Sequence, residues 1–269
     1  MPTRPALPAY ARLPLRFDTL ALREALGQLP ASAWTAHFNA DYYSGDWSGV
    51  PLLSPLQAHD RLNAAHGGAS SAGLPTAWYA PAWHQLLTQI PMQISSARLL
   101  RLGAGAQIRE HQDPDLGDPL GDVRLHIPII SHPEVEFLLE GQVVPMAEGD
   151  CWFLDLARPH RVDNRSLSAR IHLVIDARRN EWLRMQIAAG LPNTPHAHMA
   201  RSTWAFAVFR QRVQNDPRLA CQLNTLQDAR TFSARAVELG AGLALHFSID
   251  DVQAAMRLGR RAWFEQWRV

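Results

Sequence analysis

Short apolar stretches separated by turn-forming residues dominate the middle of the chain, from Ile94 to Ala177. Each stretch is about four to eight residues long and is bounded by Gly, Pro, Asp or Asn, a pattern typical of strands. No helical pattern intervenes, so roughly eight closely spaced strands favour an antiparallel sandwich or barrel over a parallel α/β sheet. The predicted strands include residues 99–102, 123–130, 134–139, 142–146, 151–156, 161–164 and 169–175.

Two local signals refine this β region. Glu140-Gly141 separates two of the strands and is predicted to form a two-residue hairpin turn. Pro128 lies inside another strand. Because proline has no N–H to donate to a sheet, its position indicates a sheet edge or a β-bulge.

Helical patterns flank the β region on both sides. They predict helices over residues 18–29, 81–90, 181–189, 203–213 and 228–239, with two more starting at Asp216-Pro217 and at Ser248. The first sixteen residues carry four Pro and are expected to form an extended lead-in. Pro192 to Pro195 interrupts the helical pattern. We therefore expect an N-terminal domain over residues 1–195, with a β core at 94–177, and a small all-α module over residues 200–269.

Composition narrows the function classes. The 269 residues are 47% hydrophobic and 19% charged, with a net charge of +1, which excludes a mainly disordered chain and predicts neither nucleic-acid nor membrane binding. All basic residues are Arg, so Schiff-base lysine chemistry and a Walker phosphate loop are excluded. Two Cys are too few for a disulfide framework. The sequence shows neither a signal segment nor a membrane helix, which predicts a cytoplasmic protein.

The candidate chemistry rests on His111, Asp113 and the distant His160. Residues two apart on a strand face the same side, so His111 and Asp113 can bind one ion, with His160 arriving from a later strand. Two imidazoles and one carboxylate occupy one face of an octahedron and leave about three positions open, as non-haem Fe(II) oxygenases require. Arg170, ten residues after His160, is a candidate to hold a carboxylate in a bidentate pair.

The histidines and acidic residues of this region also allow interpretations other than an iron site. A His-x-Asp pair arises by chance in a chain with 12 His. The acidic stretch from Asp113 to Asp122 offers oxygen ligands for a calcium-type loop, but it lacks a clear bidentate Glu. His196 and His198 are expected to lie in a solvated loop, and Cys151 is expected to be a packed strand residue.

The segment Ser96 to Ala177 resembles the aspartyl/asparaginyl β-hydroxylase family of Fe(II)/2-oxoglutarate oxygenases, which includes proline cis-hydroxylases. The resemblance covers about half of the chain, and an upstream segment from His37 to Trp47 is also similar. The phrases that carry it are His111-Gln112-Asp113, Val123-Arg124-Leu125-His126-Ile127-Pro128, Glu148-Gly149-Asp150-Cys151-Trp152-Phe153-Leu154-Asp155, Pro159-His160 and Ala169-Arg170-Ile171-His172-Leu173-Val174-Ile175-Asp176.

This resemblance implies a mainly β core with flanking helices, in the form of a double-stranded β-helix (jelly-roll, cupin-like). It implies that His111, Asp113 and His160 bind Fe(II), and that Arg170 pairs with the C5 carboxylate of 2-oxoglutarate. Arg124 and His126 would then lie against this cosubstrate. The implied activity is a dioxygenase that consumes O2 and 2-oxoglutarate and hydroxylates an amino acid.

The resemblance predicts an aspartyl or asparaginyl residue in a peptide or protein as the substrate, with free L-proline or another free amino acid as the alternative. Some family members that act on aspartyl residues lack the carboxylate ligand, whereas this chain keeps Asp113, as the hydroxylases of free L-proline do. Two alternatives of another class are a non-catalytic carboxylate sensor and a peptide-binding adaptor. Tyr42, Tyr43 and Trp47 are candidates for a substrate wall or for core packing.

A second resemblance lies in the tail. Residues Phe206 to Met256 are similar to the nitrogen-fixation-associated (nif-eleven) leader-peptide-like domain, most clearly at Asp216-Pro217, Leu239-Gly240 and Phe247-Ser248. This similarity implies a role in docking a peptide or protein partner. The alternative is a helical unit that packs against the β core or forms a dimer contact.

Overall fold

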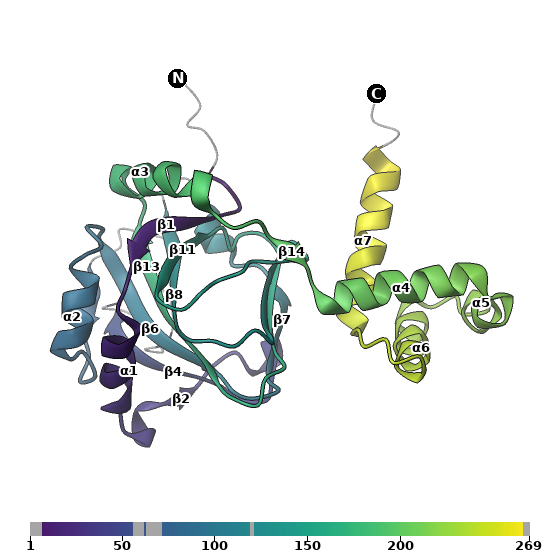
Figure 1. Ribbon diagram of the computed structural model, residues 1–269, viewed down its shortest axis with the longest axis horizontal. Coiled ribbons are helices and arrows are strands. Elements are labelled where there is room, and N and C mark those ends of the chain that lie inside the picture. Colours follow the sequence, from purple (N-terminus) through teal and green to yellow (C-terminus); the bar gives the residue numbers. More distant parts are fainter. Residues whose placement is uncertain (1–6, 56–61, 63–71, 119–120, 266–269) are drawn as a thin grey trace. The chain divides into compact units, whose positions relative to one another are not determined.

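The computed structural model describes residues 7–55, 62, 72–118 and 121–265 (Figure 1). The chain divides into two compact units. The first takes residues 1–140 and 144–197, and the second takes residues 141–143 and 198–269.

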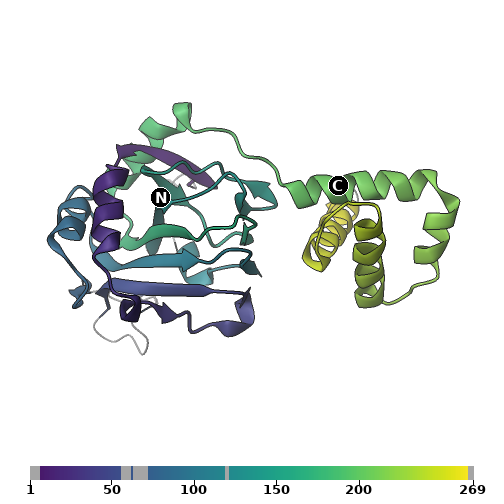
Figure 2. The ribbon, with the colours of Figure 1, turned by 60° about the horizontal axis from the view of Figure 1, so that its bottom comes forward.

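The first unit contains most of the strands, which form two antiparallel sheets (Figure 2). The strands of the chain are β1 Tyr10–Arg16, β2 Thr35–Ala36, β3 Tyr43–Ser44, β4 Trp47–Ser54, β5 Leu74–Pro75, β6 Ile94–Leu102, β7 Gln107–His111, β8 Asp122–Ile130, β9 Val135–Leu139, β10 Gln142–Val143, β11 Asp150–Leu154, β12 His160–Asn164, β13 Arg170–Arg178 and β14 His198–Met199. The larger sheet has the order β1-β11-β8-β13-β6-β4-β2, with β5 beside β4, and the smaller one contains β9-β12-β7-β3. The predicted double-stranded β-helix fold with flanking helices is thereby confirmed.

Alternation along the strands of the larger sheet produces two separate cores, because successive side chains point to opposite faces. On β11, Cys151 and Phe153 join an outer core, whereas Trp152 and Leu154 join an inner core between the sheets. The same alternation on β8 and β13 sends Leu125, Ile127, Leu173 and Ile175 outward. The inward-facing positions of these two strands are largely charged or polar: Arg124, His126, Arg170, His172 and Asp176.

Three helices cover the outer face of the larger sheet: α1 Thr19–Gly27, α2 Pro81–Leu87 and α3 Glu181–Gly190 (Figure 1). Asp18 caps α1 by accepting hydrogen bonds from the backbone of Leu20 and Ala21. From α2, Trp83 is completely buried in the outer core. Helix α3 ends on Gly190, where it meets β1.

Replacing Gly190 by alanine is expected to destabilise the first unit by about 1–3 kcal/mol, the usual cost of forcing a backbone shift in a packed interior. A Cβ at this position would lie 1.9 Å from the carbonyl oxygen of Arg12 on β1, so α3 and β1 would have to separate. Thermal or urea unfolding measures the change. Gly27→Ala is the matched control, because a Cβ there meets no atom within 4 Å, and the unfolding free energy should stay equal or rise. Equal stabilities for Gly190→Ala and the original chain would contradict the close approach.

The N-terminal segment is extended, as predicted, but its pairing was not foreseen. Tyr10–Arg16 forms β1, the edge strand that pairs with β11. Its Pro14 lies in an irregularity of the register between Leu13 and Arg16, and an edge strand tolerates the missing N–H.

Pro128 is also found where the pairing of strands is irregular, although it lies inside the sheet. It lies on the central strand β8, beside a register shift of β13 between Ile171 and His172, so the predicted bulge is confirmed and the predicted edge is not.

The predicted turn and most predicted helices are found close to their expected positions. Glu140 and Gly141 both have positive φ angles, 50° and 78°, as a two-residue hairpin turn of type I′ requires. In the second unit the helices are α4 Arg201–Asn215, α5 Pro217–Asn224, α6 Ala229–Gly242 and α7 Ile249–Glu265.

The helical unit has its own core and its own caps. Phe206, Phe209 and Phe247 pack together with ring centroids 5.0–6.4 Å apart. Ser248 and Asp251 cap α7 reciprocally, since each side chain accepts a hydrogen bond from the other's backbone N–H. None of the described helices combines the length and the apolar character needed to cross a membrane.

Candidate metal centre

His111 and His160 are brought together by strand pairing. His111 is the last residue of β7 and His160 the first residue of β12, and the two are direct partners across the antiparallel pair. Their ring centroids are 4.2 Å apart. In each case Nδ1 lies against the carbonyl oxygen two residues earlier, at 2.8 Å from Arg109 and 3.0 Å from Arg158. A carbonyl only accepts, so Nδ1 carries the proton on both rings and Nε2 keeps its lone pair for a metal.

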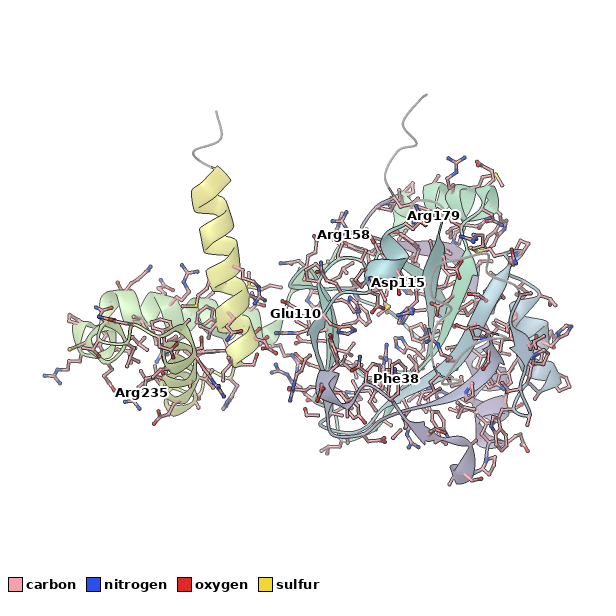
Figure 3. The ribbon with its side chains drawn as sticks, turned by 180° about the vertical axis from the view of Figure 1, so that it is seen from behind. Phe38, Glu110, Asp115, Arg158, Arg179 and Arg235 are labelled. Atoms are coloured by element: carbon pink, nitrogen blue, oxygen red, sulfur yellow. The ribbon has the colours of Figure 1, made fainter. Side chains whose placement is uncertain are left out.

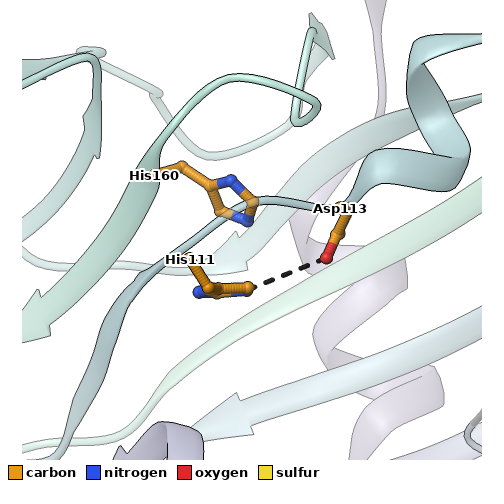
Figure 4. Close-up of side chains that lie close together, drawn as sticks. All are labelled: His111, Asp113 and His160. Atoms are coloured by element: carbon orange, nitrogen blue, oxygen red, sulfur yellow. Dashed lines mark ion pairs between the residues drawn. The ribbon is translucent and has the colours of Figure 1, made fainter.

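Asp113 completes the group, although it does not lie on the strand. Strand β7 ends at His111, and Asp113 is the residue that precedes the short 3₁₀ helix Pro114–Gly117. Its backbone N–H donates to the carbonyl of Leu156 over 2.8 Å, which fixes the turn. Its Oδ1 lies 3.9 Å from His111 Nε2 (Figure 4).

The three side chains fit a single metal ion. Their donor atoms all lie within 4.8 Å of one another. Ligands on one face of an octahedron lie about 3 Å apart when the metal–ligand bonds are about 2.1 Å long, so the side chains must turn inward by about 1–2 Å to bind an ion. Burial, aided by the neighbouring His111, lowers the pKa of His160 to about 4 and keeps that ring neutral. Burial alone would raise the pKa of Asp113, but Arg124 and the two imidazoles hold it below its ordinary value. A neutral imidazole and an ionised carboxylate are the forms that bind metals.

The group opens onto a cavity of about 360 Å³. All six residues singled out from the sequence line this cavity: His111, Asp113, Arg124, His126, His160 and Arg170. Phe38, which is labelled in Figure 3, and Tyr42 stand at the rim and are 48% and 41% exposed. Tyr42 meets the His111 ring edge-on at 5.4 Å, and Trp47 also lines the cavity. The candidate wall residues Tyr42 and Trp47 are therefore in place, whereas Tyr43 packs against the inner core.

Arg170 is a buried cation, and none of the carboxylates that the structure describes forms an ion pair with it. The residue is 2% exposed, and its Nη2 donates to Nδ1 of His172 over 2.6 Å. Its Nε has no hydrogen-bond partner, and no ion pair to Arg170 is found among the residues that the structure describes. Burial lowers the pKa of this guanidinium to about 9. An anion bound in the cavity would relieve this cost.

Two buried histidines lie next to Arg170. Nδ1 of His126 and Nδ1 of His172 are 3.4 Å apart, so both rings are interior groups with a polar neighbour. Burial, followed by the charge of Arg170, keeps the pKa of each ring well below its ordinary value. Nε2 of His126 is buried and has no hydrogen-bond partner within the described ranges of the chain.

Sequence reasoning missed three further residues of the cavity region. His37 lies flat against Trp47, with ring centroids 3.5 Å apart, and burial lowers its pKa to about 3. Arg98 lines the cavity, and Asp176 is buried behind it. The signal for Asp176 was the two-residue period of β13, which places it on the inward face with Arg170 and His172.

The other candidate residues lie elsewhere. His196 and His198 are exposed, and Cys151 is fully buried in the outer core. In the described part of the chain, the group His111, Asp113 and His160 is the one cluster of three His, Cys, Asp or Glu residues that could hold a metal, so the calcium-type loop is not formed there.

Fold and site together describe a jelly roll with a two-histidine, one-carboxylate metal centre inside it. Residues 74–180 match the aspartyl/asparaginyl β-hydroxylase family, which confirms the resemblance seen in the sequence over that segment. The similarity of the tail to the nif-eleven domain stays a prediction.

One curated relative is L-proline cis-4-hydroxylase of Rhizobium meliloti (strain 1021), which is 24% identical over 165 residues. The alignment covers 60% of this chain and 58% of the relative, so the chain spans somewhat more than half the length of that protein.

Solved structures with similar folds include a 2OG-Fe(II) oxygenase family oxidoreductase from Burkholderia pseudomallei. It is 15% identical with a TM-score of 0.46, over 64% of this chain and 86% of the other. A prolyl-4-hydroxylase from Pseudomonas putida is 13% identical with a TM-score of 0.43, over 64% and 93% of the two chains.

Proposed function

We propose that the protein is an Fe(II)- and 2-oxoglutarate-dependent dioxygenase that hydroxylates an amino acid. The observation that carries the proposal is one cavity that holds both a two-histidine, one-carboxylate group and a buried guanidinium, Arg170, for which the described residues offer no ion pair. A metal site alone serves many reactions, and an unpaired arginine alone serves many anions. Together they fit a cosubstrate that chelates iron at one end and carries a carboxylate at the other.

In this proposal His111, Asp113 and His160 hold the iron, and Arg170 holds the distal carboxylate of 2-oxoglutarate. The bound iron supplies the activation of O2 that is coupled to oxidative decarboxylation of the cosubstrate. The protein orients both molecules and excludes water. His172 keeps Arg170 in place by accepting one of its N–H groups, and the inner core closes the far side of the cavity.

The charges around the cavity favour a substrate that carries a carboxylate. Three buried or largely buried arginines, Arg98, Arg124 and Arg170, face two carboxylates, Asp113 and Asp176. Among the buried and half-buried groups, adding a divalent metal and the dianion 2-oxoglutarate leaves one positive charge uncompensated, whereas the carboxylate of Asp115, which also lines the cavity, is exposed to solvent. A substrate carboxylate neutralises that charge, and both a free amino acid and an acidic residue supply one.

Two substrates are proposed on separate grounds. The relative named L-proline cis-4-hydroxylase and the retained Asp113 favour free L-proline or another free amino acid. The matching family favours an aspartyl or asparaginyl residue in a peptide or protein. Docking of such a peptide through the helical unit stays a prediction.

The test begins with anaerobic calorimetry of Fe(II), or of Mn(II) as a redox-stable substitute, followed by 2-oxoglutarate. We expect one metal per chain and binding of 2-oxoglutarate that depends on the metal. Aerobic reactions with free amino acids and with Asp- and Asn-containing peptides are then screened for succinate and for a product heavier by one oxygen atom. A chain that binds both ligands but never forms succinate would be the carboxylate sensor, and a chain that binds no metal would refute the proposal.

A further inference from the structure

Behind the metal centre lies a chain of charged groups that ends on Asp113 of the triad and begins with two residues, Arg98 and Asp176, to which the proposed function gives no role in binding iron or 2-oxoglutarate. Asp176 is 1% exposed and accepts hydrogen bonds from Ser96 Oγ at 3.0 Å, from Arg98, and from Arg124 Nε at 2.6 Å. Arg98 is 4% exposed and also donates to the carbonyl of Leu62 over 2.7 Å. Arg124 continues the chain, because its Nη1 donates to Oδ2 of Asp113. The order of contacts is therefore Arg98, Asp176, Arg124 and Asp113.

Arg124 divides the two oxygens of Asp113 between different neighbours. Oδ2 accepts from Arg124, whereas Oδ1 is the oxygen that lies 3.9 Å from His111 Nε2. A carboxylate whose second oxygen is already occupied presents one oxygen to a metal rather than two. The guanidinium is itself held by two contacts to Asp176, from Nε at 2.6 Å and from Nη2 at 3.3 Å, so its direction is fixed.

The positive charge of Arg124 opposes metal binding at Asp113, and the negative charge of Asp176 compensates it. A guanidinium in contact with a metal ligand repels a divalent cation and competes with it for the carboxylate. Burial alone would lower the pKa of Arg124, but Asp176 first and Asp113 second raise it above its ordinary value, so the cation is permanent. Asp176 supplies the compensating negative charge from the side away from the centre, and Arg98 lets that carboxylate stay ionised in the interior.

We propose that Asp176, supported by Arg98, is a positioning residue that acts through Arg124 on Asp113. It cancels the charge of Arg124 and aims its Nη1, so that Asp113 stays available to the metal through one oxygen and leaves the remaining coordination positions open. The inference rests on the proposed function in one respect, that Asp113 is a metal ligand. Outer groups that orient metal ligands commonly change metal affinity 10- to 100-fold when they are removed.

The experiment measures the Kd of Mn(II) by anaerobic calorimetry in the full-length protein and needs no turnover. Asp176→Asn keeps the size of the side chain and removes its charge, and we expect Mn(II) binding to weaken about 10- to 100-fold. Asp150→Asn is the matched control. Asp150 is also buried on the larger sheet and paired with arginines, Arg12 and Arg16, but it lies outside the chain of contacts, so its Kd should stay unchanged.

A double-mutant cycle tests whether Asp176 acts through Arg124. In an Arg124→Met background, Asp176→Asn should change the Kd only about two- to threefold, since the residue through which it acts is gone. Equal losses with and without Arg124 would overturn the inference and leave Asp176 as a general electrostatic contributor. The visible absorption of bound Co(II), whose intensity depends on coordination geometry, should change in Asp176→Asn and stay constant in Asp150→Asn.

A folding failure is separated from a positioning role in two ways. Circular dichroism and thermal unfolding establish that each variant is folded before its Kd is compared. If Asp176→Asn does not fold, Arg124→Lys replaces it, because a single ammonium keeps the charge but cannot bridge two carboxylates. Unchanged Mn(II) affinity and an unchanged Co(II) spectrum in Arg124→Lys would then refute the inference. A wild-type chain that binds no metal would instead refute the proposed function itself.

Discussion

Replacing His160 by alanine is expected to abolish tight Fe(II) binding, with a Kd at least about 100-fold higher and no detectable succinate formation. The variant lacks one of the three donors, and the two that remain, His111 and Asp113, bind a metal far more weakly than a complete triad. The fold should persist, because His160 is at the start of β12 and faces the cavity, while the rest of β12 keeps its pairing with β7 and β9. Anaerobic metal titration and the iron content of the purified protein measure the effect.

His132→Ala is the control for this variant. His132 is an exposed histidine in the connection between β8 and β9, and its neighbours are the backbone N–H and carboxylate of Glu134. Its loss should leave iron content and turnover unchanged. If His160→Ala and His132→Ala retained the same iron content as the original chain, the proposed triad would be wrong.

Replacing Arg170 by lysine is expected to weaken 2-oxoglutarate binding by about 10- to 100-fold while metal affinity changes less than about threefold. A lysine ammonium keeps the charge but cannot form two parallel hydrogen bonds to one carboxylate, and a hydrogen bond to a charged group contributes roughly 1.5–3 kcal/mol. Lysine also loses the contact through which Arg170 Nη2 donates to His172. The measurement is the Kd of 2-oxoglutarate in the presence of saturating Mn(II).

Arg101→Lys provides the comparison for Arg170→Lys. Arg101 lies on the same sheet, where it pairs with Asp46 at 3.2 Å and lies over the ring of Trp34. The same substitution at this position should leave 2-oxoglutarate affinity unaltered. An unaltered Kd in Arg170→Lys would assign the carboxylate to another cation, with Arg124 as the next candidate.

The β core and the hairpin turn at Glu140-Gly141 could be predicted from the sequence, because both depend on residues that are close together in the chain. Alternating apolar residues on β8 and β13, and the short apolar run on β11, indicate strands without reference to the rest of the chain. The N-terminal strand β1 was missed because four prolines argue against sheet pairing, and only its edge position makes Pro14 acceptable. That position is decided by β11, more than a hundred residues further along the chain, and no local pattern reports it.

In the candidate site, too, local pattern accounts for some features and contacts between distant segments account for the others. Spacing and residue type identified His111, Asp113 and His160 as the residues that come together. The argument that His111 and Asp113 share one face of a strand does not apply, because the strand ends at His111 and Asp113 lies beyond it. Asp113 reaches the site because its backbone is tied to Leu156, a contact between distant segments. Arg98 was missed for a related reason: its role depends on Asp176, from a neighbouring strand.

The separation of the larger sheet into an apolar outer face and a polar inner face has a consequence for how the protein tolerates change. On β13, Leu173 and Ile175 pack under the helices, whereas Arg170 and Val174 line the cavity. Adjacent codons of one strand thus carry different constraints, with one set governing the stability of the sheet and the other the chemistry of the cavity. An engineer who varies Arg170 or Val174, while leaving their alternate neighbours and the ion-paired Asp176 fixed, changes the lining of the cavity without removing the burial and the ion pairs that hold the sheet together.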